Sequence, residues 1–169
     1  HKEYRRQRQM CIRDRSYFAA GMSPFDALCH AFSTVAIGGF STHDASLGYY
    51  EENAILLVSS LFMLFSAINF GLHFVALQRR TARVYARDSE TGFFITVIAL
   101  ATVVTCSLLL TTETLGVEDS LIHGVFQTIS IATTTGFTTQ DFSIWPLFLP
   151  ILLLMLSFMG GCVGSTGGG

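Results

Sequence analysis

Residues 23–44 read Ser23-Pro-Phe-Asp-Ala-Leu-Cys-His-Ala-Phe-Ser33-Thr-Val-Ala-Ile-Gly-Gly39-Phe40-Ser-Thr42-His-Asp44, and residues 120–141 read Ser120-Leu-Ile-His-Gly-Val-Phe-Gln-Thr-Ile-Ser130-Ile-Ala-Thr-Thr-Thr-Gly136-Phe137-Thr-Thr139-Gln-Asp141. The two stretches align without a gap, 97 residues apart, and Ser, Gly, Phe, Thr and Asp recur in register. Each copy leads into a long apolar segment. A repeated unit of short helix, Thr/Gly loop and membrane-length helix is typical of a pore built from re-entrant hairpins.

The composition indicates an all-α membrane protein. The chain is 50% hydrophobic and 13% charged, with a mean hydropathy of +0.50, which is too apolar for an ordinary soluble domain. Residues 54–77 and 92–112 contain no Lys, Arg, Asp or Glu, and both reach the ~20 residues that cross a bilayer. Residues 144–159 predict a shorter helix that stops inside the membrane.

The charges predict the orientation. Beyond the first fifteen residues, every basic side chain lies just after the first apolar helix, at Arg79, Arg80, Arg83 and Arg87, which marks that side as cytoplasmic. The opposite side is acidic, with Asp26, Asp44, Glu51, Glu52, Glu113, Glu118, Asp119 and Asp141. These carboxylates either form a vestibule that concentrates cations or are simply tolerated outside, and both interpretations stay open.

The chain divides into three segments. Residues 1–16 carry six of the ten basic residues on the side expected to be external, against the positive-inside trend. We therefore interpret residues 1–16 as a foreign or artefactual tail, the alternative being a basic cytoplasmic tail. Residues 17–91 then form one pore unit, and residues 92–169 form a second one that begins with an outward crossing.

Each pore unit is predicted to contain a half-length helix. Ser23 as N-cap, Pro24 at the first position and Asp26 three residues after Ser23 favour a helix that runs to about Thr34. Such a helix is about 16 Å long, half a bilayer. Its counterpart begins at residues 118–120, with acidic residues at the positive helix end, and runs to about residue 131.

The loops after these helices are the candidate ion filter. Glycine can adopt positive φ there and turn successive carbonyls toward one axis, as in K⁺ filters, and the lack of a carboxylate favours a monovalent cation. One copy alone would more simply be a turn between helices. The predicted filter residues are Val35, Ala36, Ile37, Gly38, Gly39, Thr133, Thr134, Thr135 and Gly136, with K⁺ at Ile37, Gly38, Thr134 and Thr135.

The chain ends in a Gly-rich segment that is predicted to be an unwound, movable gate at membrane depth below the filter. It lacks the Gly-Lys-Ser/Thr ending of a phosphate-binding loop. The equivalent stretch of the first unit, residues 62–74, is expected to stay helical. The predicted gating residues are Gly160, Gly161, Cys162, Val163, Gly164, Ser165, Thr166, Gly167, Gly168 and Gly169.

No catalytic residue, disulfide framework, zinc site or organic cofactor is predicted. The cysteines form no C-x-x-C pair, and the histidines of the helical segments are interpreted as packing or interfacial residues. These residues are Cys11, Cys29, Cys106, Cys162, His30, His73 and His123.

At residues 23–44, 132–139 and 160–169 the chain resembles the membrane subunits of the Trk/Ktr/HKT superfamily of potassium transporters, most closely its bacterial Trk branch, over residues 17–169. The resemblance implies four pore units around one axis, of which this chain holds most of the second and part of the third. Gly39 and Gly136 fall on the family's filter glycines, and residues 160–169 on its gating loop. It also implies a homodimer in the lipid of the bacterial inner membrane, with a cytosolic nucleotide-binding regulatory subunit (TrkA-like) and no nucleic acid.

The leading hypothesis is therefore K⁺ uptake, with K⁺ as the transported ion. A Na⁺-permeable or Na⁺-coupled transporter of the same superfamily is the alternative, although glycine at both visible filter positions favours K⁺. A non-conducting structural membrane subunit is the alternative of another class. An enzyme using residues 160–169 would need a Lys or a catalytic base nearby, and the membrane spans contain none.

Overall fold

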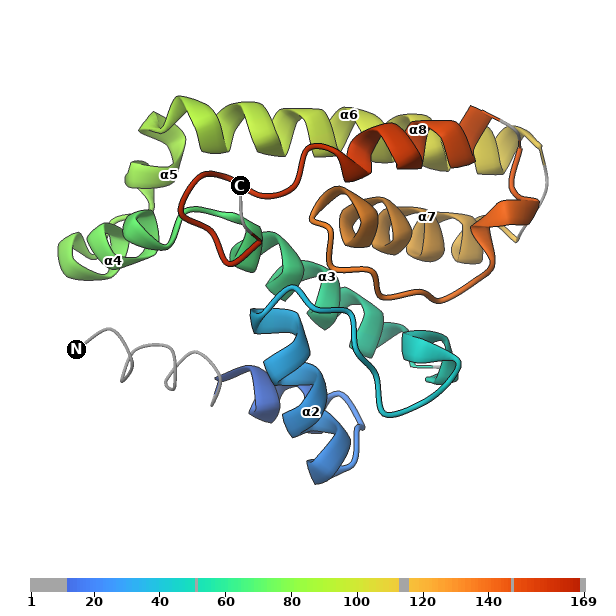
Figure 1. The fold of residues 1–169 in the computed structure, drawn as a ribbon, viewed down its shortest axis with the longest axis horizontal. Coiled ribbons are helices and arrows are strands. Elements are labelled where there is room, and N and C mark those ends of the chain that lie inside the picture. The colour runs from blue at the N-terminus through green and yellow to red at the C-terminus, as the bar shows by residue number, and fades with distance from the viewer. Residues whose placement is uncertain (1–11, 51, 113–115, 147, 168–169) are drawn as a thin grey trace.

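The computed structural model describes residues 12–50, 52–112, 116–146 and 148–167, which form helices and loops (Figure 1). The expectations for residues 1–11, Glu51, Glu113, Gly168 and Gly169 lie outside the described residues. After a helix at 12–19 the elements are α2 (Pro24–Val35), η1 (Ser46–Tyr49), α3 (Asn53–Ala67), α4 (Phe70–Arg79), α5 (Arg83–Arg87), α6 (Ser89–Thr111), α7 (Val117–Ala132), η2 (Phe142–Ile144) and α8 (Phe148–Ser157).

The second half-length helix, α7, is the centre of the packing. It contacts α3, α6 and α8, while the first half-length helix, α2, packs on α3 (Figure 1). Gly124 lies close against α6, because a Cβ there would lie 3.0 Å from Sγ of Cys106 and 3.3 Å from Cδ1 of Leu109. Small residues at such contacts allow membrane helices to approach closely.

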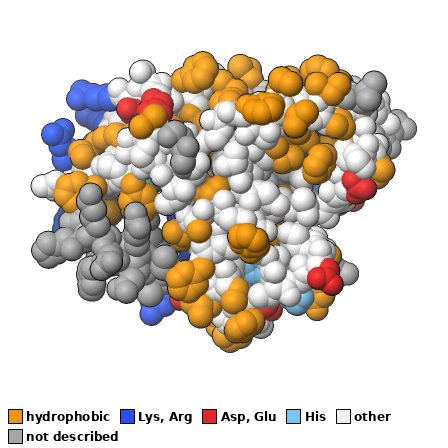
Figure 2. All heavy atoms as spheres, viewed as in Figure 1, with side chains coloured by type: hydrophobic (Ala, Val, Ile, Leu, Met, Phe, Trp, Pro, Cys, Tyr) orange, Lys and Arg blue, Asp and Glu red, His pale blue; other side chains and the backbone are white. Residues whose placement is uncertain are grey.

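One described helix, α6, is long and apolar enough to cross a membrane by itself, with 23 residues. The pair α3 and α4 passes the same test only as a broken span, and α8 is shorter. The outward surfaces of α6 and α8 are apolar, as hydrophobic side chains gather along that edge of the molecule in Figure 2. The exposed residues there include Phe93, Leu100, Val103, Phe148, Ile151 and Leu154.

The predicted unbroken crossing at 54–77 is wrong. Helix α3 ends at Ala67, and α4 begins at Phe70 after a bend of 97°. Asn69 stabilises the break, because its side-chain oxygen accepts a hydrogen bond from the amide of Gly71 at 2.7 Å and so caps α4. The long apolar helix of the first unit is therefore broken, although a break was expected only in the second unit.

Other predicted boundaries shift. The crossing expected at 144–159 is the ten-residue helix α8, preceded by η2 and by Trp145 and Pro146. The boundary drawn at residue 16 falls inside the helix 12–19. In that helix Arg13 is buried, with its guanidinium 5.1 Å from the ring centre of Phe62. Arg13 of the predicted tail therefore packs against α3.

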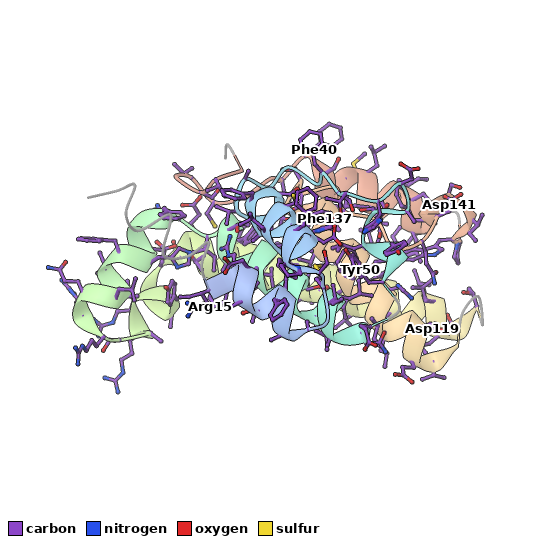
Figure 3. The ribbon with its side chains drawn as sticks, turned by 90° about the horizontal axis from the view of Figure 1, so that it is seen from below. Arg15, Phe40, Tyr50, Asp119, Phe137 and Asp141 are labelled. Atoms are coloured by element: carbon purple, nitrogen blue, oxygen red, sulfur yellow. The ribbon has the colours of Figure 1, made fainter. Side chains whose placement is uncertain are left out.

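The two ends of the molecule carry opposite charge. Asp119 and Asp141 lie at the end away from α4 and α5 in Figure 3. Arg79, Arg80, Arg83 and Arg87 belong to α4, α5 and the turn between them. This separation is the one that the charge pattern predicted.

Candidate ion-conducting site

The first turn of each half-length helix follows from its sequence. Ser23 caps α2, accepting a hydrogen bond from the amide of Asp26 at 3.1 Å, and its hydroxyl donates to the Asp26 carboxylate at 2.8 Å. The predicted N-cap is confirmed, whereas the Asp26 carboxylate bonds the Ser23 hydroxyl and not the Ser23 backbone amide that a capping box uses. Helix α7 instead has Gly116 as N-cap without a side-chain bond, and places Glu118 and Asp119 in its first turn, where the helix dipole favours negative charge.

Both half-length helices end in the same hydrogen-bond pattern. In the first copy, the amide of Gly38 donates to the carbonyl of Ser33 at 2.9 Å. In the second copy, the amide of Thr135 donates to the carbonyl of Ser130 at the same distance. Because these residues align in the sequence repeat, the repeat extends to the backbone conformation.

The two predicted filter loops share one backbone pattern. Ile37 and Thr134 have φ values of 50° and 60°, and two residues later Gly39 and Gly136 have φ values of 66° and 85°. The predicted positive φ of both glycines is confirmed. A left-handed conformation at a β-branched residue is uncommon, so its presence at the same position of both loops marks a shared, constrained geometry.

Val35 was predicted to belong to the first filter loop, and this is wrong. It is the last residue of α2, and its repeat counterpart Ala132 is the last residue of α7. The next residues, Ala36 and Thr133, cap the two helices with φ near −80°. The alignment of the two repeats could have shown this, because Ala132, the equivalent of Val35, was not predicted to belong to the second loop.

The two loops lie against each other. A Cβ placed on Gly39 would overlap the carbonyl oxygen of Thr135, so only glycine fits this approach. Further out, the amide of Gly48 donates to the carbonyl of Thr138 at 3.1 Å, and the amide of Thr138 donates to the hydroxyl of Ser46 at 3.2 Å. Residues of the first unit thus contact the loop of the second unit at several positions.

The two repeat phenylalanines differ in their surroundings. Phe137 is fully buried, with its ring centre 5.9 Å from that of His30 on α2. Phe40 is 81% exposed and points away from the body in Figure 3. The hydroxyl of Ser130 also donates to the carbonyl of Phe137 at 2.7 Å. The second loop is therefore held by both units, and His30 acts as a packing residue between them.

A side-chain contact between each half-length helix and the loop that follows it was not predicted. The hydroxyl of Thr42 donates to the carboxylate of Asp26 at 2.6 Å, and Nδ1 of His123 lies 2.9 Å from the hydroxyl of Thr139. Asp26 and His123 occupy equivalent repeat positions, as do Thr42 and Thr139. The alignment of the two repeats could have revealed that these contacts are equivalent. Asp and His differ too much, however, for sequence identity alone to indicate it.

We predict that Asp26→Ala destabilises α2 and the loop that follows it as far as Thr42. Hydrogen bonds from Thr42 and then Ser23 lower the pKa of Asp26 to about 2. A lowered pKa means that this stabilisation is complete above a pH of about 4 and is lost as the pH falls toward 2. Thermal unfolding in detergent should show a loss of about 1 kcal/mol at pH 7, shrinking near pH 2. An equal loss of stability in Asp44→Ala would contradict the role of the hydrogen bond between Thr42 and Asp26.

The Gly-rich segment returns from α8 to the break between α3 and α4 (Figure 1). Its described part, 160–167, is non-helical, as predicted. The amide of Cys162 donates to the carbonyl of Ala67 at 2.8 Å, and the amide of Phe70 donates to the carbonyl of Gly164 at 3.1 Å. The segment therefore supplies partners for the backbone groups that the helix break leaves free.

The far end of this segment reaches the two predicted filter loops. A Cβ on Gly167 would lie 3.1 Å from Cδ1 of Ile37 and 3.7 Å from the carbonyl oxygen of Thr133. The hydroxyl of Thr166 donates to the carbonyl of Ser66 at 3.2 Å. The segment is thus fixed to α3 on one side and contacts both predicted filter loops on the other.

Comparisons with known proteins agree with this geometry. The family model described as "TrkH: Cation transport protein" matches residues 9–169. The chain is 52% identical over 154 residues to the Trk system potassium uptake protein TrkH of Halomonas elongata, covering 91% of this chain and 32% of the relative. It is 49% identical to TrkH of Escherichia coli K12, covering 89% of this chain and 31% of the relative.

A solved structure is also similar. The crystal structure of the potassium transporter TrkH from Vibrio parahaemolyticus superposes with a TM-score of 0.90 at 48% identity, covering 94% of this chain and 35% of that chain. The chain therefore spans about a third of the length of the relatives that it matches. The matched range begins at residue 9 and includes both copies of the sequence repeat. The chain belongs to the TrkH family of cation transport proteins.

Proposed function

We propose that this chain forms two adjacent units of a K⁺-selective uptake pathway. One observation carries the proposal: two loops with the same left-handed positions, Ile37 with Gly39 and Thr134 with Gly136, meet in direct backbone contact. Repeated left-handed residues can turn consecutive carbonyls to one side, which a carbonyl filter requires. The names of the relatives, potassium uptake proteins, support K⁺ as the ion.

In this proposal the carbonyls of Ile37, Gly38, Thr134 and Thr135 replace the hydration shell of K⁺. The half-length helices α2 and α7 end at the loops, so their negative dipole ends stabilise a cation there. Neither loop contributes a carboxylate, which favours a monovalent ion over Ca²⁺ or Mg²⁺. Residues 160–169 form the gate, because their described part contacts both loops from the side of the helix break.

The proposal for the whole protein goes further. Two units do not close a ring, so the pore needs further units from the rest of a full-length protein. We place that protein in the bacterial inner membrane as a homodimer with a TrkA-like cytosolic regulatory subunit, because the relatives are components of Trk systems. The exposed apolar surfaces of α6 and α8 fit contact with lipid or with the missing units.

The test is ion flux through the full-length protein reconstituted in liposomes. We expect K⁺ or Rb⁺ uptake down an imposed gradient, with Na⁺ uptake at least about tenfold slower, which corresponds to about 1.4 kcal/mol of discrimination. Empty liposomes are the control. Equal K⁺ and Na⁺ fluxes would support the Na⁺-permeable alternative, and no flux with or without the regulator would support a structural subunit.

A further inference from the structure

We infer that Glu90 is a latch that holds the Gly-rich segment in its blocking position. The inference rests on the proposed function, in which this segment is the gate. It assigns the latch to one hydrogen bond, from the amide of Val163 to Oε1 of Glu90 at 2.7 Å. The two residues are far apart in the sequence, so the bond fixes the relation of α6 to the gate.

The tip of the segment is held between two helix N-termini. On one side the amide of Phe70, at the start of α4, donates to the carbonyl of Gly164, and a Cβ on Gly164 would lie 3.3 Å from the Asn69 side chain. On the other side Glu90, in the first turn of α6, accepts from Val163. Two adjacent residues of the tip are thus bonded to two different helices.

These two helix starts are the two ends of one cytoplasmic hairpin. Helices α4 and α5 and their turn run from Phe70 to Arg87, and only Asp88 and Ser89 separate α5 from Glu90. The described cytoplasmic arginines all belong to this hairpin. A force on the hairpin from the cytosol therefore reaches the gate through both contacts, without passing through the filter.

Of these two hydrogen bonds, the one to Glu90 is made by a side chain. The bond to Gly164 joins two backbone groups, whereas the bond to Val163 uses a carboxylate oxygen. A carboxylate accepts stronger hydrogen bonds than a neutral group. Asp88 supports it by capping α6, since its carboxylate accepts from the amide of Thr91 at 2.8 Å. The carboxylate of Glu90 is therefore the point at which this latch can be removed without changing the backbone.

The first experiment compares Glu90→Ala with Glu90→Gln in the full-length protein with its regulator absent. Glutamine keeps an acceptor oxygen at the same reach, whereas alanine removes it. We expect Glu90→Ala to raise resting K⁺ flux in liposomes about tenfold, as loss of one charge-assisted hydrogen bond allows, with the K⁺/Na⁺ ratio unchanged. Glu90→Gln should raise resting flux only about threefold, because a neutral acceptor makes a hydrogen bond about half as strong.

A second variant removes the donor and leaves Glu90 intact. Val163→Pro has no amide hydrogen, and Val163 is not among the residues with positive φ. It should raise resting flux as Glu90→Ala does. The double variant should add little, because both changes remove the same bond. Full additivity of the two would overturn the latch.

A third measurement does not depend on conduction. Cys162 is 3% exposed and precedes Val163, so release of the tip should uncover its thiol. In a background with the other cysteines replaced by Ser, a membrane-impermeant maleimide added from the cytosolic side should label Cys162 about tenfold faster in Glu90→Ala than in wild type. Glu90→Gln should label only about threefold faster than wild type, because it keeps a weaker hydrogen bond to Val163.

The outcomes separate this inference from the proposed function. If wild type conducts K⁺ but Glu90→Ala changes neither flux nor labelling, the latch is overturned and the K⁺ pathway stands. If glutamine and alanine act alike, the charge at the start of α6 matters and the hydrogen bond does not, which also overturns it. If wild type fails to conduct K⁺, the function is overturned, while faster labelling of Glu90→Ala would still support the latch.

Discussion

Gly39→Ser in the full-length protein should abolish most of the discrimination between K⁺ and Na⁺. A side chain there would overlap the carbonyl oxygen of Thr135 in the neighbouring loop, and the φ of 66° is one that side chains disfavour. The strain amounts to about 1–3 kcal/mol before any overlap is counted, so both loops must shift. Because the displaced groups are carbonyls of the proposed filter, we expect the K⁺/Na⁺ permeability ratio to fall at least about tenfold.

The matched control is Gly38→Ser. A Cβ on Gly38 would meet the ring of Phe40 at 3.2 Å, and that ring is exposed and can move. Selectivity should therefore change much less. Gly136→Ser should act in the same direction as Gly39→Ser, because its φ of 85° carries the same strain. Reversal potentials measured with K⁺ and Na⁺ gradients decide the matter, and an unchanged ratio in well-expressed Gly39→Ser would remove this glycine from the filter.

Gly161→Val should have the opposite signature, with a large change in flux and little change in selectivity. A Cβ on Gly161 would lie 2.5 Å from Oγ of Ser165 and 2.9 Å from the carbonyl oxygen of Ala67. The first atom belongs to the segment itself and the second to the end of α3, so the segment must move away from the helix break. Overpacking of about 1–3 kcal/mol should shift the gate equilibrium and raise resting K⁺ flux about tenfold.

Gly92→Ala is the control for a glycine substitution near the same end of the molecule. A Cβ on Gly92 meets nothing within 4 Å in the described residues, and alanine favours the helix α6 by about 1 kcal/mol. It should conduct like wild type. If Gly161→Val retains wild-type flux and the wild-type response to the regulator, the Gly-rich segment is only a linker.

The sequence alone predicted the repeat and its local consequences. The 97-residue register predicted two half-length helices, each followed by a loop with a glycine at positive φ, and the structure confirms both. The capping of α2 by Ser23 was predicted as well. These features are local: a cap or a left-handed glycine depends on residues within a few positions along the chain. Charge placement also predicted which ends of the molecule are acidic and basic.

The break between α3 and α4 was decided by the tertiary structure. Residues 54–77 are apolar and compatible with one helix, and nothing local except Asn69 disfavours it. Breaking a helix leaves backbone groups unpaired, at a cost of several kcal/mol each in a membrane. That cost is offset here by a segment about 100 residues later, through Cys162, Thr166 and Gly164. Partners so distant in sequence cannot be inferred from the helix itself, so the sequence determined the repeated unit and only the folded chain determined where its helices stop.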